Sequence, residues 1–329
     1  MMASPPPPCA GFRKLGVVSG QTKEGNTVKG TRLSLHSALQ QTSTGIQSLD
    51  LLLGNGINLA SSILFQELDR GEYSPVFARH FMSEGVTHGH IVVGVGERVS
   101  SWLENLPRPI ELNTDMQPHA EDNLKIAWRY KRKIQSRFSH SYDLSQQRSL
   151  EELKNCRLFS KSDATYKDIL QYVKTVVKEN EDNVVRVVLD RPMYPIEDEA
   201  KFLRFHYNLR KITAQKNVVT LCIYPTQTLS DSVTFSLDQL YNYVLGVEAL
   251  PRDKKSVFKD YHGILHIVKL DNMSSFTMPL HDVTDRFFKV QRKKFIIEKM
   301  HLPPDLSETV SRSTNASSTN CASSKGIDF

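Results

Sequence analysis

The sequence predicts a three-layer α/β/α domain with a mostly parallel central sheet and antiparallel strands at one edge. Short apolar runs of strand length lie at 62–67, 90–96, 183–190 and 218–225. Helical patterns stand between several of these runs, and the order strand, helix, strand at this spacing is typical of parallel βαβ units. In the last third, apolar runs follow one another directly, which favours antiparallel strands at the far edge of the sheet. These later runs are 241–250, 262–270 and 293–304.

The domain is expected to begin with a short helix and a tight turn. Ile46, Leu49 and Leu53 recur at helical spacing and form one apolar face. Gly54 and Gly56 follow directly, where glycine can end a helix and turn the chain.

Three longer helices are predicted after the first strand, at 75–84, 166–178 and 197–215. The first has proline in its opening turn, where a missing backbone N–H leaves no bond unmade. The last has acidic residues in its first turn and basic residues in its last, as the helix dipole favours. Residues 97–160 are polar and contain a basic stretch, so we expect an irregular excursion from the core there.

Composition limits the class of protein. The chain has 329 residues, of which 39% are apolar and 24% charged, as in a soluble globular protein. Residues 1–30 and 306–329 have little apolar periodicity, so two flexible tails are expected around a single domain at 31–305. The formal net charge of +6 is compatible with an acidic partner such as nucleic acid, and also with an ordinary basic protein.

The sequence argues against several kinds of site. The four cysteines form no CxxC pair, and the histidines stand in no HExxH or triad-like context, so we expect neither catalytic residues nor a metal site. There is no secretory signal and no apolar run of about 18 residues, which argues against a membrane. The cytoplasm, and also the nucleus, are the expected locations.

The order of the predicted elements indicates a nucleotide site, but the residue types in its loop argue against phosphate binding. The pattern T-G-x-x-x-L-D-x-x-L-G-x-G-I at 44–57, followed by strand, loop and helix, is how RecA-type ATPase domains begin. The loop after that strand is the place of the phosphate cradle G-x-x-x-x-G-K-[ST]. Here the loop lacks the lysine and has one glycine, and its acids would repel a phosphate. Positions that could retain a nucleotide role are Arg70, Gly71, Ser74 and, after a later strand, the aspartate Asp190 at a metal-linked position.

A basic stretch at 125–138, KIAWRYKRKIQSRF, holds six Lys or Arg residues, three aromatic residues and no acid. Cations interleaved with stacking rings suit single-stranded or loop RNA. In the first half, alternating apolar residues also fit an edge strand with its basic side chains outward. The candidate RNA-binding residues are therefore Lys131, Arg132, Lys133 and Arg137. A second basic cluster at 289–299 is expected to be a solvated strand end.

Several unusual sequence blocks resemble one protein family. They are TSTGIQSLDLLLGNGI, the lysine-free EYSPVFARHFMSEG, KIAWRY, KDYHGILHI and HLPPDLSETVSRS. On these blocks, which run from 42 to 312, the chain resembles the PAXNEB family, the fourth subunits of the Elongator complex. The resemblance implies a RecA-like fold with degenerate nucleotide motifs.

The resemblance also implies an accessory, non-catalytic role. Members of this family assemble with the fifth and sixth Elongator subunits into a hetero-hexameric ring with two copies of each. The ring binds tRNA and docks on the catalytic subcomplex, which places carboxymethyl-type groups on wobble uridine 34. RecA domains form rings through the nucleotide face, so exposed apolar residues of the 49–53 helix and of the edge strands are expected ring contacts.

Two other functions stay open on the sequence. One is a RecA-type ATPase with an unorthodox phosphate site, with ATP as its cofactor; otherwise no cofactor is expected. The other is a purely structural scaffold whose partners make every RNA contact. The missing lysine argues against the first, and the basic stretch argues against the second.

Overall fold

The computed structural model describes most of the chain between residues 28 and 299. All described residues belong to one compact unit, Met1–Lys299. The described ranges are 28–34, 39–68, 71–110, 138–160, 164–215, 217–250, 261–271 and 285–299. The predicted tails 1–30 and 306–329 therefore lie almost wholly outside the described residues.

A nine-stranded sheet is the centre of the fold, with the strand order β14-β13-β12-β11-β4-β10-β9-β5-β8. The six strands from β11 to β8 in this order are parallel to one another. Their bounds are β4 Ser61–Glu67, β5 Ile91–Val95, β8 Cys156–Phe159, β9 Val185–Asp190, β10 Val218–Pro225 and β11 Tyr243–Ala249. β4, β5, β9 and β10 are buried over their whole length, as a sheet with helices on both faces requires.

The far edge of the sheet is antiparallel. β12 (Gly263–Lys269), β13 (Asp285–Gln291) and β14 (Lys294–Glu298) continue the sheet beyond β11. The run at 241–250 was also expected to be antiparallel, but β11 is parallel to β4. The reason is α6 (Asp231–Leu240), a helix that the sequence reading missed and that provides the crossover a parallel strand needs.

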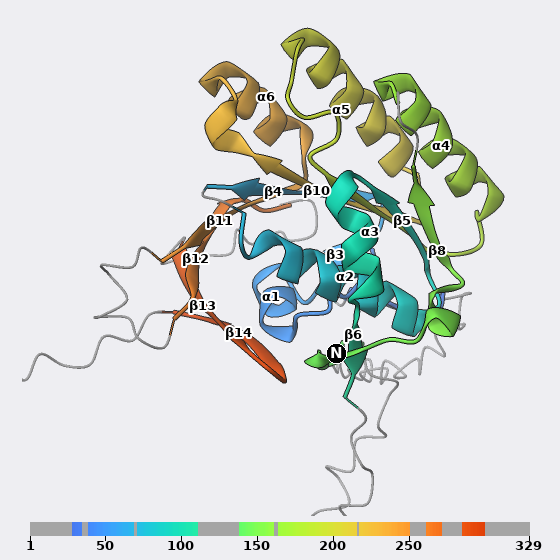
Figure 1. Cartoon of the computed structure of the whole chain (residues 1–329), viewed down its shortest axis with the longest axis vertical. Coiled ribbons are helices and arrows are strands. Elements are labelled where there is room, and N and C mark those ends of the chain that lie inside the picture. The colour runs from blue at the N-terminus through green and yellow to red at the C-terminus, as the bar shows by residue number, and fades with distance from the viewer. Residues whose placement is uncertain are drawn as a thin grey trace, which may run out of the picture. The chain divides into compact units, whose positions relative to one another are not determined.

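Helices cover both faces of the sheet, which confirms the three-layer fold (Figure 1). α4 (Tyr166–Glu179), α5 (Glu199–Thr213) and α6 lie side by side on one face. α1 (Gln47–Leu52), α2 (Ser74–His88) and α3 (Glu97–Glu104) lie on the other. None of the helices in the described ranges is long and apolar enough to cross a membrane.

Each helical layer covers its own hydrophobic cluster. Phe77 and Phe81 of α2 and Trp102 of α3 belong to one cluster. Val173 of α4 and Phe202 of α5 belong to the other. Burial of side chains of this size stabilises the folded state by about 1.5–3 kcal/mol each, so both helical layers are firmly attached to the sheet.

Regular elements occupy the described parts of 97–160, which corrects the expectation of an irregular excursion there. Besides α3 and β8 they are β6 (Pro107–Pro109), β7 (Tyr142–Gln147) and the 3-10 helix η2 (Leu150–Leu153). β6 and β7 pair with each other, and β8 extends the main sheet beside β5. The apolar residues of α3 share one buried helical face, but the polar residues between them concealed that pattern in the sequence.

The remaining short elements are three strands near the start of the described chain and one 3-10 helix after β10. β1 (Thr31–Leu33), β2 (Gln40–Thr42) and β3 (Ile57–Asn58) form a small antiparallel sheet. The helix η3 spans Thr226–Thr228. The predicted first helix is confirmed as α1, and its apolar face is buried in the core.

Candidate functional site at the phosphate-loop position

The turn between β4 and α2 lies where a RecA-type domain would hold a phosphate. The carboxyl end of β4 leads through this turn to the N-terminus of α2, which begins at Ser74. Helix N-termini favour anions, because their first backbone N–H groups have no partner within the helix. Arg70 lies outside the described residues, whereas Gly71, Ser74 and Asp190 can be placed.

Glu67, the last residue of β4, takes the central position of this site. Its side chain is fully buried, and both of its oxygens receive hydrogen bonds. Ser74 Oγ donates to Oε1, and Arg98 Nη2 lies 3.3 Å from the same oxygen. Arg191 donates to Oε2 through Nε at 2.8 Å and also through Nη2. A carboxylate of the protein therefore engages the groups that a bound phosphate would need.

Asp190, at the end of β9, belongs to the same cluster. Arg98 Nε donates to its Oδ2 at 2.7 Å, and Arg98 Nη2 donates to its Oδ1. Burial raises the pKa of Asp190, while the hydrogen bond and charge of Arg98 oppose that rise. Asp190, which stands where RecA-type folds place an aspartate near the metal ion, thus forms a bidentate ion pair with Arg98.

Two glycines allow the backbone to close around these charges. Gly71 has φ of 71°, and a Cβ placed there would collide with the side chains of Glu67 and Arg191. Gly96, which precedes α3, has φ of 128° and lies against the carbonyl of Asp190. Only glycine combines a positive φ with so close an approach. The one glycine of the loop is therefore required by the ion-pair cluster itself.

The cluster of Glu67, Arg98, Asp190 and Arg191, together with Ser74, is called the ion-pair cluster below. It has two acids and two arginines, so its formal charge sums to zero. A phosphate could enter only by displacing Glu67 from its arginines, and breaking a buried ion pair costs about 3–5 kcal/mol. This arrangement favours cohesion between β4, β9 and α3 over phosphate binding.

The sequence reading found some members of the cluster and missed others. Gly71, Ser74 and Asp190 were candidates. Gly71 and Ser74 lie against Glu67, and Asp190 is joined to Glu67 through Arg98. Arg98 and Arg191 were missed. The available signal was position, because each follows the carboxyl end of a buried parallel strand, and such ends meet at one edge of the sheet.

A pocket of about 750 Å³ lies beside the cluster, at the carboxyl ends of β5 and β9. Arg98, Asp190 and Arg191 line it together with Met193 and Tyr194. Crevices at this edge of open α/β sheets are the usual place for ligands, and the volume lies in the range of small-molecule sites. The pocket is therefore the part of this face where a ligand or a partner side chain fits.

Comparisons with known proteins place the chain in a family. The PAXNEB protein family matches residues 24–329, which is most of the chain. The chain belongs to the PAXNEB family. Relatives include Elongator complex protein 4 of Mus musculus, 29% identical over 92% of this chain and 87% of the relative. The Xenopus laevis protein of that name is 30% identical over 87% and 85%. The Saccharomyces cerevisiae protein is 21% identical over 91% and 82%.

A solved structure supports the fold of this PAXNEB chain independently. The KaiC-like protein PH0186 from Pyrococcus horikoshii OT3 superposes with a TM-score of 0.50 and 14% identity. The match covers 79% of this chain and 99% of that protein. The predicted RecA-like fold is confirmed, and at this identity the comparison supports the fold alone.

The other predicted contact residues differ in what the structure says of them. Lys131, Arg132, Lys133 and Arg137 lie outside the described residues. On the 49–53 helix, Leu49 and Leu53 are buried in the core, as their apolar spacing predicted, and Leu51 is the largely exposed apolar residue, at 71%. Its contact with a ring partner stays a prediction.

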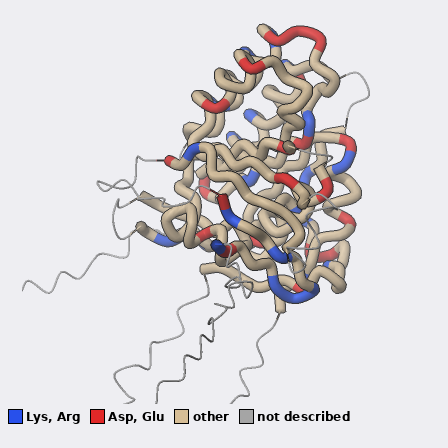
Figure 2. The backbone as a smooth tube through the Cα atoms, turned by 90° about the vertical axis from the view of Figure 1, so that its left-hand side faces the viewer, with Lys and Arg blue, Asp and Glu red and all other residues tan. Residues whose placement is uncertain are grey.

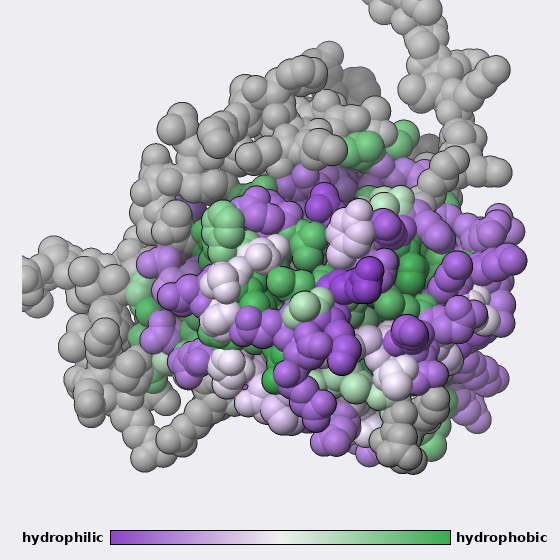
Figure 3. Space-filling model, turned by 90° about the horizontal axis from the view of Figure 1, so that it is seen from above, coloured by the Kyte–Doolittle hydropathy of each residue, from purple (hydrophilic) through white to green (hydrophobic). Residues whose placement is uncertain are grey.

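The described surface is mixed in charge and in hydropathy. In the view of Figure 2, positions of Lys and Arg and positions of Asp and Glu are both scattered along the described backbone. Over α4–α6, hydrophilic and hydrophobic side chains are interspersed (Figure 3).

Proposed function

We propose that this chain is a non-catalytic accessory subunit of the Elongator complex. It packs with the fifth and sixth subunits in a hetero-hexameric ring, and the ring docks on the catalytic subcomplex and binds tRNA. The reaction it supports is modification of wobble uridine 34, in the cytoplasm and nucleus. Membership of the PAXNEB family supports the complex, because the relatives carry the name Elongator complex protein 4.

One observation carries the non-catalytic part of the proposal. Glu67 engages Ser74, Arg98 and Arg191 at the phosphate-loop position. Hydrolysis of a nucleotide needs cations that are free to meet the β- and γ-phosphates. Because Arg98 and Arg191 are paired with carboxylates of the chain, we infer that they stabilise the fold and do not contact a nucleotide.

The rim of the pocket supports a role for this face in assembly. Met193 and Tyr194 are 38% and 46% exposed beside the charged pocket wall. Exposed apolar and aromatic side chains next to a polar pocket are common in protein interfaces. A neighbouring subunit that covers them would use the nucleotide face for ring contacts.

Native mass spectrometry of the chain co-expressed with its two expected partner subunits tests this proposal. The expected result is one assembly with two copies of each chain, which gains mass when tRNA is added. Tyr194→Glu should weaken the assembly, and Tyr207→Glu on α5, with 50% exposure, is the matched control. A monomer that ignores both partners and tRNA would contradict the proposal.

The pocket beside Asp190 also favours a second candidate, a RecA-type ATPase with an unorthodox site. Phosphate release from ATP, measured on the chain alone and on the assembled ring, separates the two. We expect no hydrolysis above background in either sample. Hydrolysis that disappears in Asp190→Asn would favour the ATPase.

A further inference from the structure

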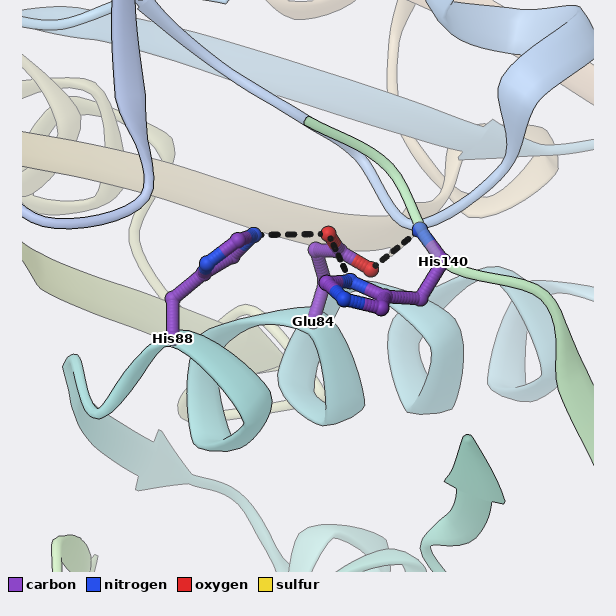
Figure 4. A group of neighbouring side chains, drawn as sticks. All are labelled: Glu84, His88 and His140. Carbon is purple, nitrogen blue, oxygen red and sulfur yellow. Dashed lines mark hydrogen bonds and ion pairs between the residues drawn. The ribbon is translucent and has the colours of Figure 1, made fainter. Parts of the chain in front are cut away.

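Three side chains with metal-binding chemistry converge at the C-terminal end of α2, the opposite end of this helix from Ser74 (Figure 4). Glu84 and His88 are four residues apart on α2 and so lie on one face of the helix. His140 comes from the segment that leads into β7. His88 Nε2 lies 2.9 Å and His140 Nδ1 lies 3.0 Å from the same oxygen, Oε1 of Glu84.

The carboxylate is fixed in position by the surrounding residues. Glu84 is fully buried, and its second oxygen accepts hydrogen bonds from Tyr142 Oη at 2.5 Å and from the His140 backbone N–H at 3.3 Å. Oε1 is thereby left facing the two imidazole rings. The His88 side chain is 10% exposed and the His140 side chain 23% exposed, so the site opens to solvent on the His140 side.

A cation beside the buried carboxylate of Glu84 would stabilise its negative charge. The Glu84 side chain is fully buried, and the side chains bonded to its two oxygens are those of His140, His88 and Tyr142. Among the described residues, the ion pairs of Glu84 are with these two histidines, which are cationic only when protonated. With neutral rings, therefore, a buried negative charge stands without a formal positive partner in contact.

A buried cation on this side of the sheet, Arg186, directs its hydrogen bonds within the described residues to groups other than Glu84. Arg186 of β9 is fully buried and donates to Phe81 O at 3.0 Å, to Thr42 Oγ1 at 2.7 Å and to His90 Nδ1 at 3.1 Å. All three of its donor nitrogens are thus used elsewhere. Its charge contributes at longer range and would weaken, but not replace, a metal ion at Glu84.

The ligand geometry fits a borderline transition metal. The candidate ligand atoms of the three residues all lie within 4.8 Å of one another. Around a tetrahedral Zn²⁺ with bonds of about 2.0–2.2 Å, ligand atoms stand roughly 3.4 Å apart. Each nitrogen, 2.9 or 3.0 Å from Oε1, therefore has to move away from that oxygen by a few tenths of an ångström. The two nitrogens, which lie within 4.8 Å of each other, also have to stand at the spacing of zinc ligands. Two imidazoles and one carboxylate are also a ligand set that zinc uses.

We propose that Glu84, His88 and His140 bind one divalent transition-metal ion, with Zn²⁺ as the best-fitting ion. Tyr142 orients the carboxylate through its second oxygen, and the exposed side leaves a fourth position for water. The ion joins α2 to the segment before β7, two parts of the chain that are 52–56 residues apart in sequence. This inference goes beyond the accessory role proposed above and does not depend on it.

Zinc titration of the full chain, stripped of metal with a chelator and dialysed, tests the site. Calorimetry with Zn²⁺ should give one equivalent per chain, and Co²⁺ should give the visible absorption bands of a tetrahedral site. His140→Gln and His88→Gln should each weaken Zn²⁺ binding at least 100-fold. His266→Gln is the control, because its carboxylate partners Glu248 and Asp285 bond to opposite ring nitrogens and cannot share one ion with the ring.

A second readout guards against misfolded variants. Binding to the folded state alone raises the melting temperature in proportion to the logarithm of free metal. Zn²⁺ should therefore raise the melting temperature of the unchanged chain and of His266→Gln, but not that of His140→Gln. The proposal is overturned if the unchanged chain binds less than stoichiometric Zn²⁺, or if His140→Gln and His88→Gln bind it as the unchanged chain does.

Discussion

The guanidinium of Arg98, in the first turn of α3, bonds both carboxylate oxygens of Asp190 at the end of β9. The same guanidinium also reaches Glu67 at the end of β4. One side chain thus joins a helix to two strands of the sheet, at the edge where related folds hold a nucleotide. The consequence is a face whose helix and strands are joined by ion pairs of the chain itself.

Replacing Arg98 should destabilise the fold markedly. Arg98→Met leaves the buried carboxylates of Glu67 and Asp190 short of one cation, which costs about 3–5 kcal/mol for a fully buried pair. Because the Arg98 side chain is 32% exposed, water can replace part of the lost interaction, and we expect about 2–3 kcal/mol. Urea unfolding measured at pH 7 gives the difference in the free energy of unfolding.

An exposed ion pair provides the control for that experiment. Arg157 pairs with Glu179 at 2.7 Å, and their side chains are 39% and 53% exposed. Arg157→Met should lower the free energy of unfolding by less than about 1 kcal/mol. Equal losses in the two variants would mean that the ion-pair cluster has no special structural role.

Gly71 should tolerate no side chain, for two separable reasons. In Gly71→Ala the methyl group meets both an unfavourable positive φ and the side chains of Glu67 and Arg191. We expect a loss of about 2–4 kcal/mol from backbone strain and overpacking together. Gly54 has φ of 86° but open space around its Cβ position. Gly54→Ala should therefore show the backbone part alone, about 1–2 kcal/mol, and similar losses for both would refute close packing at Gly71.

Buried histidines should make the protein sensitive to mild acid. His206 of α5 is buried and bonds through Nδ1 to Tyr241 Oη at 2.7 Å, and burial lowers its pKa to about 3. Between that value and the ordinary histidine pKa of about 6.5, the unfolded chain binds a proton that the folded chain does not. Stability therefore falls as the pH drops through this range.

Removing the titrating group should flatten that dependence. His206→Gln keeps a polar atom for Tyr241 but cannot take up a proton. Between pH 6.5 and 4.5, its free energy of unfolding should therefore fall by about 2–3 kcal/mol less than that of the unchanged chain. Burial also lowers the pKa of His80 to about 4 and that of His90 to about 3. The free energy of unfolding of His206→Gln should therefore still rise with pH, but less steeply. Denaturant unfolding at several pH values measures both slopes, and parallel curves would rule out the role of His206.

Periodicity made most of the fold predictable, and long-range geometry set the limit. The strands at 62–67 and 218–225 are apolar throughout, so a parallel sheet buried on both faces followed from composition. α6 was missed because only Val233 and Leu237 of that helix are buried, which leaves a weak apolar pattern. At the site, Gly71, Ser74 and Asp190 follow from motif positions. Arg98 and His140 do not, since their partners lie 92 and 56 residues away in sequence.

Charge reversal in the basic stretch tests the proposed contact with tRNA. Lys131→Glu, Arg132→Glu and Lys133→Glu together should weaken tRNA binding by the assembled ring without dissolving the ring. Each phosphate contact that is lost lowers the slope of log affinity against log salt by about 0.7–0.9. Filter binding of tRNA at several salt concentrations measures both the affinity and the slope, and native mass spectrometry of the same samples reports the assembly.

The choice of control decides what that result means. Lys293→Glu with Lys294→Glu reverses charge at the exposed turn between β13 and β14, where a solvated strand end was expected. If only general electrostatic attraction brings tRNA to the ring, this pair should weaken binding about as much, per charge, as the triple variant. If the 131–133 segment touches the phosphates, only the triple variant should lower the salt slope. An unchanged affinity in the triple variant would leave the chain as a scaffold whose partners hold the tRNA.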